Sequence, residues 1–168
     1  MKPYSPRLRK TMLTAHITAS LGWFGAVVAF LALAITGLAG SSPQTVRGAY
    51  VSMELVGWGV IVPLAGASLL TGVMQSLGTA WGLFRYYWVI AKLLITVLAA
   101  GLLLVHMQPV GHLADAAARA ALDGVKAVRI QLLADAVAAA VALLTAAGLS
   151  VFKPRGVTRY GRRRQCEQ

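Results

Sequence analysis

Four long apolar stretches constrain the fold of this chain more than any other feature. Each holds about 20 mostly apolar residues, the length a helix needs to cross a hydrocarbon core of about 30 Å. They cover residues 12–38, 51–77, 87–107 and 130–152. Only 12% of the residues are charged, against about 25% in soluble domains. The sequence therefore predicts an all-α protein in which residues 1–168 form a single membrane domain, a four-helix transmembrane bundle.

The connections between these stretches are polar and mostly short. Pro109 and Gly111 are expected to stop the third helix. The longest connection, residues 108–129, carries acidic and basic residues three or four apart, spacings that favour ion pairs in a helix. We expect there either a short helix on the membrane surface or an ordinary solvated helical loop. Pro63 is expected to kink the second helix.

The distribution of positive charge predicts how the chain is oriented in the membrane. Lysine and arginine accumulate on the cytoplasmic side of membrane proteins. All but four of the 16 lysines and arginines fall on the side of the two termini. The four exceptions are Arg47, Arg119, Lys126 and Arg129. Both termini are therefore expected in the cytoplasm, and the high alanine and arginine usage favours a bacterial plasma membrane.

The C-terminal tail, residues 153–168, is densely basic. Basic clusters next to a transmembrane helix attract anionic lipid headgroups. The tail residues expected to face lipid are Lys153, Arg155, Arg162, Arg163 and Arg164.

Ionisable residues inside the apolar stretches form an inner layer near the cytoplasmic side. His16 lies about 6 Å into the first helix at 1.5 Å per residue, and Lys92 enters the third helix to a similar depth. Gln75 approaches the same level at the end of the second helix, with Arg85 at the edge of the layer. His16 is a candidate ligand, and Lys92 is expected to extend toward the headgroups.

A second, outer layer is expected on the opposite side. It combines Glu54 near the start of the second helix, His106 at the end of the third and Asp135 in the fourth. His112 is positioned to fold back over this layer. Arg47 and Arg129 are expected to neutralise the carboxylates.

Three interpretations of the outer layer stay open. Imidazole with carboxylates suits a divalent metal, whereas such residues also relay protons in transporters. A purely structural hydrogen-bond network is the third. A haem held by both His16 and His106 is excluded, because their depths differ by more than about 20 Å. A haem would instead need His106 with His112, one histidine with another ligand, or a pair shared between two copies.

The sequence favours a non-enzymatic membrane protein. It contains no hydrolase or phosphate-loop motif, and its single cysteine cannot build a metal cage. The candidate functions are a role associated with haem, copper or a divalent metal, a small dimeric proton-coupled transporter, and a membrane scaffold. The expected partners are the lipid bilayer and a second copy or another membrane protein, with no nucleic acid.

Three short runs carry a resemblance to a known family. The runs 16–25, 87–93 and 106–112 resemble a family of small bacterial integral membrane proteins of uncharacterised function, well represented in actinobacteria. More distantly, an early-helix histidine followed by Trp23-Phe24-Gly25 is similar to copper-resistance D-type membrane domains and small b-type cytochrome proteins. That similarity implies copper or haem handling, with His16 at the matching position.

Overall fold

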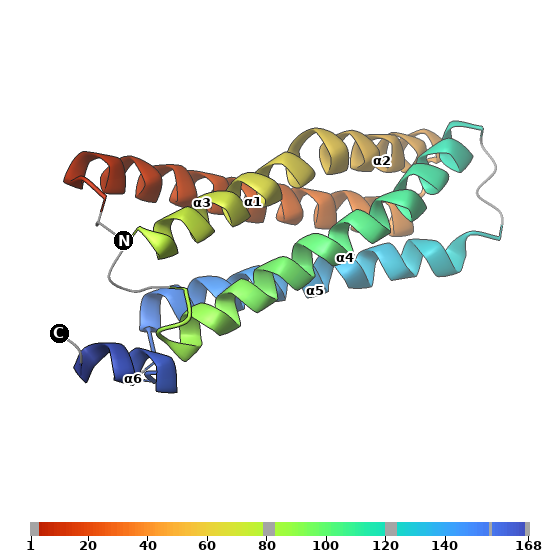
Figure 1. Cartoon of the computed structure of the whole chain (residues 1–168). Coiled ribbons are helices and arrows are strands. Elements are labelled where there is room, and N and C mark those ends of the chain that lie inside the picture. The colour runs from red at the N-terminus through yellow and green to blue at the C-terminus, as the bar shows by residue number, and fades with distance from the viewer. Residues whose placement is uncertain (1–3, 79–82, 120–123, 155, 167–168) are drawn as a thin grey trace.

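The structure is a bundle of long helices (Figure 1). The computed structural model describes residues 4–78, 83–119, 124–154 and 156–166, without the side chains of 164–166. Its elements are α1 (Pro6–Ala39), α2 (Pro43–Val56), the π-helical turn η1 (Gly57–Ile61), α3 (Val62–Leu77), α4 (Tyr87–Ala118), α5 (Lys126–Phe152) and α6 (Arg159–Cys166). Because α2, η1 and α3 continue into one another, four long helices result, and the predicted all-α four-helix bundle is confirmed.

These four helices are built for an apolar solvent. Their most apolar windows have mean hydropathies between 1.7 and 2.4. Large apolar side chains point outward along them; Leu55 is 74% exposed and Val151 is 75% exposed. Apolar surface this extensive is unfavourable in water and is satisfied by lipid. The chain is therefore a multi-pass integral membrane protein.

Local capping residues start two of the helices earlier than hydropathy predicts. Pro6 and Pro43 are the first residues of α1 and α2. Proline suits this position because its missing N–H would have no helical partner there. The Ser5 side chain also accepts a hydrogen bond from the Leu8 N–H at 3.4 Å. Residues 12 and 51, the expected starts, mark where the apolar sequence begins. Both helices begin several residues before it.

The prediction that the third helix stops at Pro109 and Gly111 is wrong. α4 passes through Pro109 and continues to Ala118. Proline removes one backbone hydrogen bond from a helix, but the packing of the residues that follow it offsets that cost. Val110, Leu113 and Ala117, which follow the proline, are all at most 3% exposed. The expected connection of residues 108–129 thus shrinks to 119–125, and no separate surface helix forms among its described residues.

The disturbance expected at Pro63 takes the form of η1. The Val62 N–H bonds to the Gly57 carbonyl oxygen, five residues back, as in a π-helix. Pro63 has no N–H and its ring crowds the preceding turn, so a wider turn just before it relieves that conflict. The helix of residues 43–77 therefore stays continuous.

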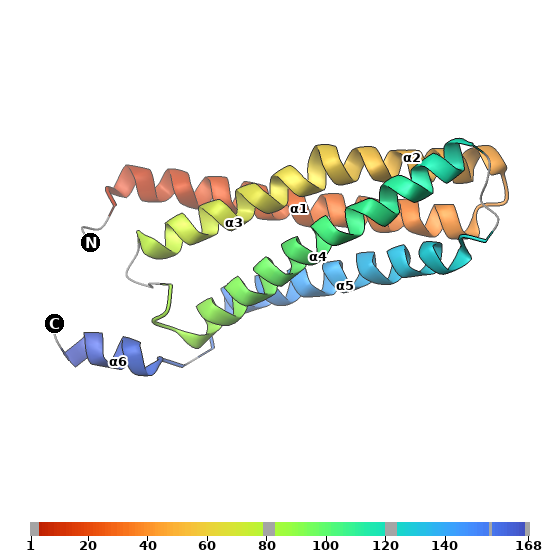
Figure 2. The ribbon, with the colours of Figure 1, turned by 45° about the vertical axis from the view of Figure 1, so that its right-hand side comes forward.

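The helices pack around α1. It contacts α2, α3 and α5, while α4 closes the bundle against α2 and α5. We call the end at which α1 begins and α5 ends the termini end, and the end at which α1 ends and α5 begins the loop end. α3 and α4 diverge toward the termini end (Figures 1 and 2). The largest fully buried side chains include Tyr50, Met53 and Met107.

Candidate functional site

Two cavities lie between the four long helices. The loop-end cavity, about 340 Å³, is lined by residues from α1, η1, α4 and α5 and holds His106 and Asp135. The termini-end cavity, about 760 Å³, is lined by residues from α1, α3, α4 and α5 and holds His16, Gln75 and Lys92. The termini-end cavity thus holds three residues of the predicted inner layer, and the loop-end cavity holds two of the predicted outer layer.

His16 and Lys92 form a direct pair in the termini-end cavity. His16 Nδ1 lies 3.1 Å from the Ser68 carbonyl oxygen. A carbonyl oxygen only accepts, so Nδ1 carries the proton and donates it. Nε2 is then free to accept from Lys92 Nζ at 3.4 Å. Both ring nitrogens are engaged, and a metal on His16 would have to displace Lys92.

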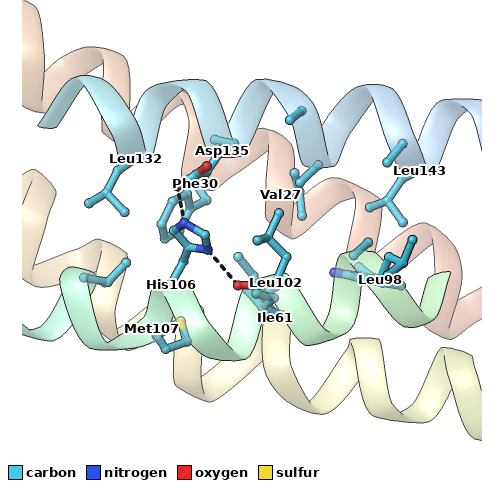
Figure 3. A pocket seen from close by; sticks show the side chains of 18 of the residues that line it. Val27, Phe30, Ile61, Leu98, Leu102, His106, Met107, Leu132, Asp135 and Leu143 are labelled. Carbon is cyan, nitrogen blue, oxygen red and sulfur yellow. Dashed lines mark hydrogen bonds and ion pairs between the residues drawn. The ribbon is translucent and has the colours of Figure 1, made fainter. Parts of the chain in front are cut away.

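His106 is oriented by its own helix in the loop-end cavity. Its Nδ1 donates to the Leu102 carbonyl oxygen at 2.8 Å (Figure 3). This bond places the Nδ1 proton and directs Nε2 across to α5. There the Gln131 side-chain amide donates to Nε2 at 3.2 Å. Because an accepting Nε2 is unprotonated, this arrangement describes the neutral imidazole.

Asp135 lies beside the same nitrogen. Its Oδ2 is 3.1 Å from His106 Nε2, within ion-pairing distance (Figure 3). Among the described residues, Oδ2 is buried without a hydrogen-bond partner. The two side chains are 17% and 28% exposed, so both are largely enclosed. The pair thus brings an imidazole nitrogen and a carboxylate oxygen within reach of one shared proton.

Glu54 and His112, the other members of the predicted outer layer, do not line this cavity. A Cβ built on Gly111 would lie 3.3 Å from Glu54 Oε1, so this carboxylate lies against α4 about 7.5 Å beyond His106. His112 is exposed. Within the described part of the chain, no three His, Cys, Asp or Glu side chains come together as a metal site. The four-residue outer layer is therefore reduced to a pair.

Arg129 does not neutralise the carboxylates as expected. Its Nε donates to the Tyr50 hydroxyl at 2.7 Å, and its Nη2 donates to the Gly37 carbonyl oxygen. The guanidinium also lies 5.5 Å from the centre of the Tyr50 ring. This loop-end clamp of Arg129, Tyr50 and Gly37 ties α5 to α1 and α2. Sequence reasoning missed it because a tyrosine in an apolar stretch is usually an interfacial residue.

The basic tail is docked on the loop before α4. Thr158 is buried; its hydroxyl donates to the Phe84 carbonyl oxygen at 2.7 Å and accepts from the Gly161 N–H at 3.0 Å. Tyr86 and Val157 form an antiparallel bridge beside it.

The predicted lipid contact of this tail stays a prediction. Arg162 and Arg163 of α6 are exposed, and Lys153 is exposed at the rim of the termini-end cavity. Arg155 and the side chain of Arg164 lie outside the described residues.

The two cavities meet in the middle of the bundle. Trp23 and Leu143 line both of them. Trp23 is 3% exposed and belongs to the buried core. These two side chains therefore form the partition between the loop-end and the termini-end cavity.

No family model, curated protein or solved structure matches this chain. The resemblance to small bacterial membrane proteins, and the more distant one to copper-resistance and cytochrome domains, accordingly stays a prediction.

Proposed function

We propose that this chain is a proton-coupled membrane carrier in which His106 and Asp135 exchange the proton. One observation carries the proposal: a carboxylate oxygen lies 3.1 Å from an imidazole nitrogen in an otherwise apolar cavity between membrane-spanning helices. Ionisable side chains are expensive at such positions and mark proton pathways in transporters.

The pair supports a two-state cycle. The hydrogen bond to Leu102 occupies Nδ1 of His106, so proton exchange is confined to Nε2. When Nε2 is neutral, it accepts from Gln131. When Nε2 is protonated, Gln131 can no longer donate to it, and the imidazolium pairs with Asp135. Uptake of one proton thus exchanges one partner on α5 for another four residues away.

The two cavities support a carrier over a simple binding protein. Alternating access requires space on each side of a barrier, and the Trp23–Leu143 partition separates two such spaces. The lysine and arginine distribution supports a cytoplasmic termini end. The proton would then enter from the opposite side.

A proton site needs only the two side chains that meet here. A zinc site, by comparison, uses at least three protein ligands. The proton-coupled carrier therefore accounts for the pair with fewer assumptions than the metal-associated role does.

The test is a pH jump applied to proteoliposomes adsorbed on a solid-supported membrane. The expected result is a transient current as protons reach the pair, and this current needs no cargo. Asp135→Asn should reduce it to the level of protein-free liposomes.

Asp115→Asn is the matched control, because Asp115 is an exposed carboxylate near the loop end of α4. It should keep the wild-type current. A wild-type protein without any current, or an Asp135→Asn variant that keeps it, would refute the proposal.

A further inference from the structure

The termini-end cavity is electropositive. Two lysines, Lys92 and Lys153, line it, and no aspartate or glutamate is among its described lining residues. Hydroxyl and amide side chains add hydrogen-bonding capacity: Ser20, Ser68, Gln75, Ser76, Thr96 and Ser150. Its volume of about 760 Å³ falls within the range of about 300–1,000 Å³ typical of small-molecule sites.

The Lys92 ammonium has unused donors that face this space. Within the described part of the chain, its hydrogen-bond partner is His16 Nε2 at 3.4 Å. An ammonium carries three donors, so two remain. His16 is a neutral acceptor in this arrangement, because its proton is on Nδ1 toward Ser68. The positive charge of Lys92 is thus solvated by an imidazole but not neutralised.

The remaining walls are apolar. Leu13, Ile17 and Leu21 from α1 and Leu144 and Val151 from α5 line the cavity. Lys92 is five residues into α4, about 7.5 Å from its first residue. That depth corresponds to the boundary between headgroups and acyl chains. A ligand that fits both the lysine and the apolar walls needs an anionic group near Lys92 and an apolar chain.

We propose that the termini-end cavity binds a monoanionic amphiphile, with its carboxylate or phosphodiester on Lys92 and its chain along the apolar wall. One negative charge matches the one ammonium enclosed by the cavity, that of Lys92, since Lys153 is exposed at the rim. Such a ligand is either a fatty acid or an anionic phospholipid of the adjoining leaflet. The proposal concerns equilibrium binding and does not depend on the carrier function, so the binding experiment and the current measurement fail separately.

The test uses the full chain in detergent micelles with the fluorescent fatty acid cis-parinaric acid. Trp23 and Trp88 line the cavity and serve as energy donors to the bound probe. Lys92→Gln should weaken binding roughly tenfold or more, the effect of losing a charge-assisted hydrogen bond. Lys10→Gln, which removes an exposed lysine from the same end of the bundle, should leave the affinity unchanged.

A second variant keeps the test valid if Lys92→Gln does not fold. Ser150→Phe fills the cavity without changing any charge, and the serine hydroxyl bonds only within its own helix in the described structure. It should weaken binding, whereas Thr145→Phe on the exposed side of α5 should not.

Competitors identify the source of the anion. Displacement of the probe by phosphatidylglycerol but not phosphatidylcholine supports a bilayer lipid as occupant, and displacement by neither supports a fatty acid. The proposal is overturned if parinaryl alcohol binds as tightly as the acid, if Lys92→Gln and Ser150→Phe both bind like their controls, or if the wild type binds no probe.

Discussion

Gly37→Ala is expected to open the loop end of the bundle. A Cβ at this position would lie 2.5 Å from Tyr50 Cζ and 2.8 Å from its hydroxyl oxygen. Carbon atoms in normal contact are about 3.5–4.0 Å apart, so the overlap is about 1 Å. The Tyr50 ring is 2% exposed and its hydroxyl is bonded to Arg129, so it has little room to move.

The free energy of unfolding should fall by about 1.5–5 kcal/mol. Overpacking a rigid site costs about 1–3 kcal/mol. Shifting the ring also breaks its bond from a charged group, which costs about 1.5–3 kcal/mol. Alanine offsets about 1 kcal/mol of this, because it is the better helix former.

The measurement is unfolding in mixed micelles of dodecyl maltoside and sodium dodecyl sulfate, followed by circular dichroism. Gly25→Ala in the same helix is the control, because a Cβ there meets nothing within 4 Å. In a Tyr50→Leu background the ring is gone, so Gly37→Ala should lose most of its effect. Equal stabilities of the Gly37→Ala and Gly25→Ala proteins would refute the argument.

Three further outcomes are expected. Arg129→Lys should cost about 1–3 kcal/mol in the same unfolding assay, because lysine cannot bond Tyr50 and Gly37 with one planar group. Thr158→Val should release the tail and speed its cleavage by trypsin, whereas Thr145→Val, whose hydroxyl bonds within its own helix, should not. Addition of zinc or of a chelator should leave the unfolding midpoint unchanged. The purified protein would contradict this expectation if it held stoichiometric metal, or showed a Soret band that shifts on reduction, and if His106→Ala removed that metal or band.

The depth of the polar side chains could be predicted from the sequence. A helix rises by a constant amount per residue, so counting from the ends of the apolar stretches gives each level. This count predicts one level for His16 and Lys92, which form a hydrogen bond. It predicts another level for His106 and Asp135, which lie within ion-pairing distance.

The direction of each side chain around its helix could not be predicted. It depends on which helices are neighbours and how each is rotated, and the nearly uniform hydrophobicity of these stretches carries little such information. Glu54 lies toward the loop end as predicted, but against Gly111 and about 7.5 Å beyond His106. Arg129 was placed on the correct side but binds Tyr50 instead of a carboxylate. The extension of α4 beyond Pro109 was missed because burial there is set by packing on α2.

The π-turn η1 keeps one face of a long helix buried. Ala49, Met53, Gly57, Ile61 and Ala65 are all buried and follow one another at a spacing of four residues. In a regular α-helix each such step advances by about 40° more than a full turn, so four steps would carry the stripe about 160° around the helix. A π-helical turn contains more residues than an α-helical one, so it offsets this drift. Residues spaced by four therefore stay on the buried face of the helix.

Loss of the wider turn η1 at constant chain length would therefore rotate the helix that follows. If residues 57–61 were wound as a regular α-helix without loss of a residue, α3 would turn by about 100° relative to α2. Ser68, which holds His16 through its carbonyl oxygen and Ser20 through its hydroxyl, would leave its position against α1. The termini-end cavity thus depends on a π-turn that lies beside the loop-end cavity, and regular winding at that turn would disassemble the termini-end cavity.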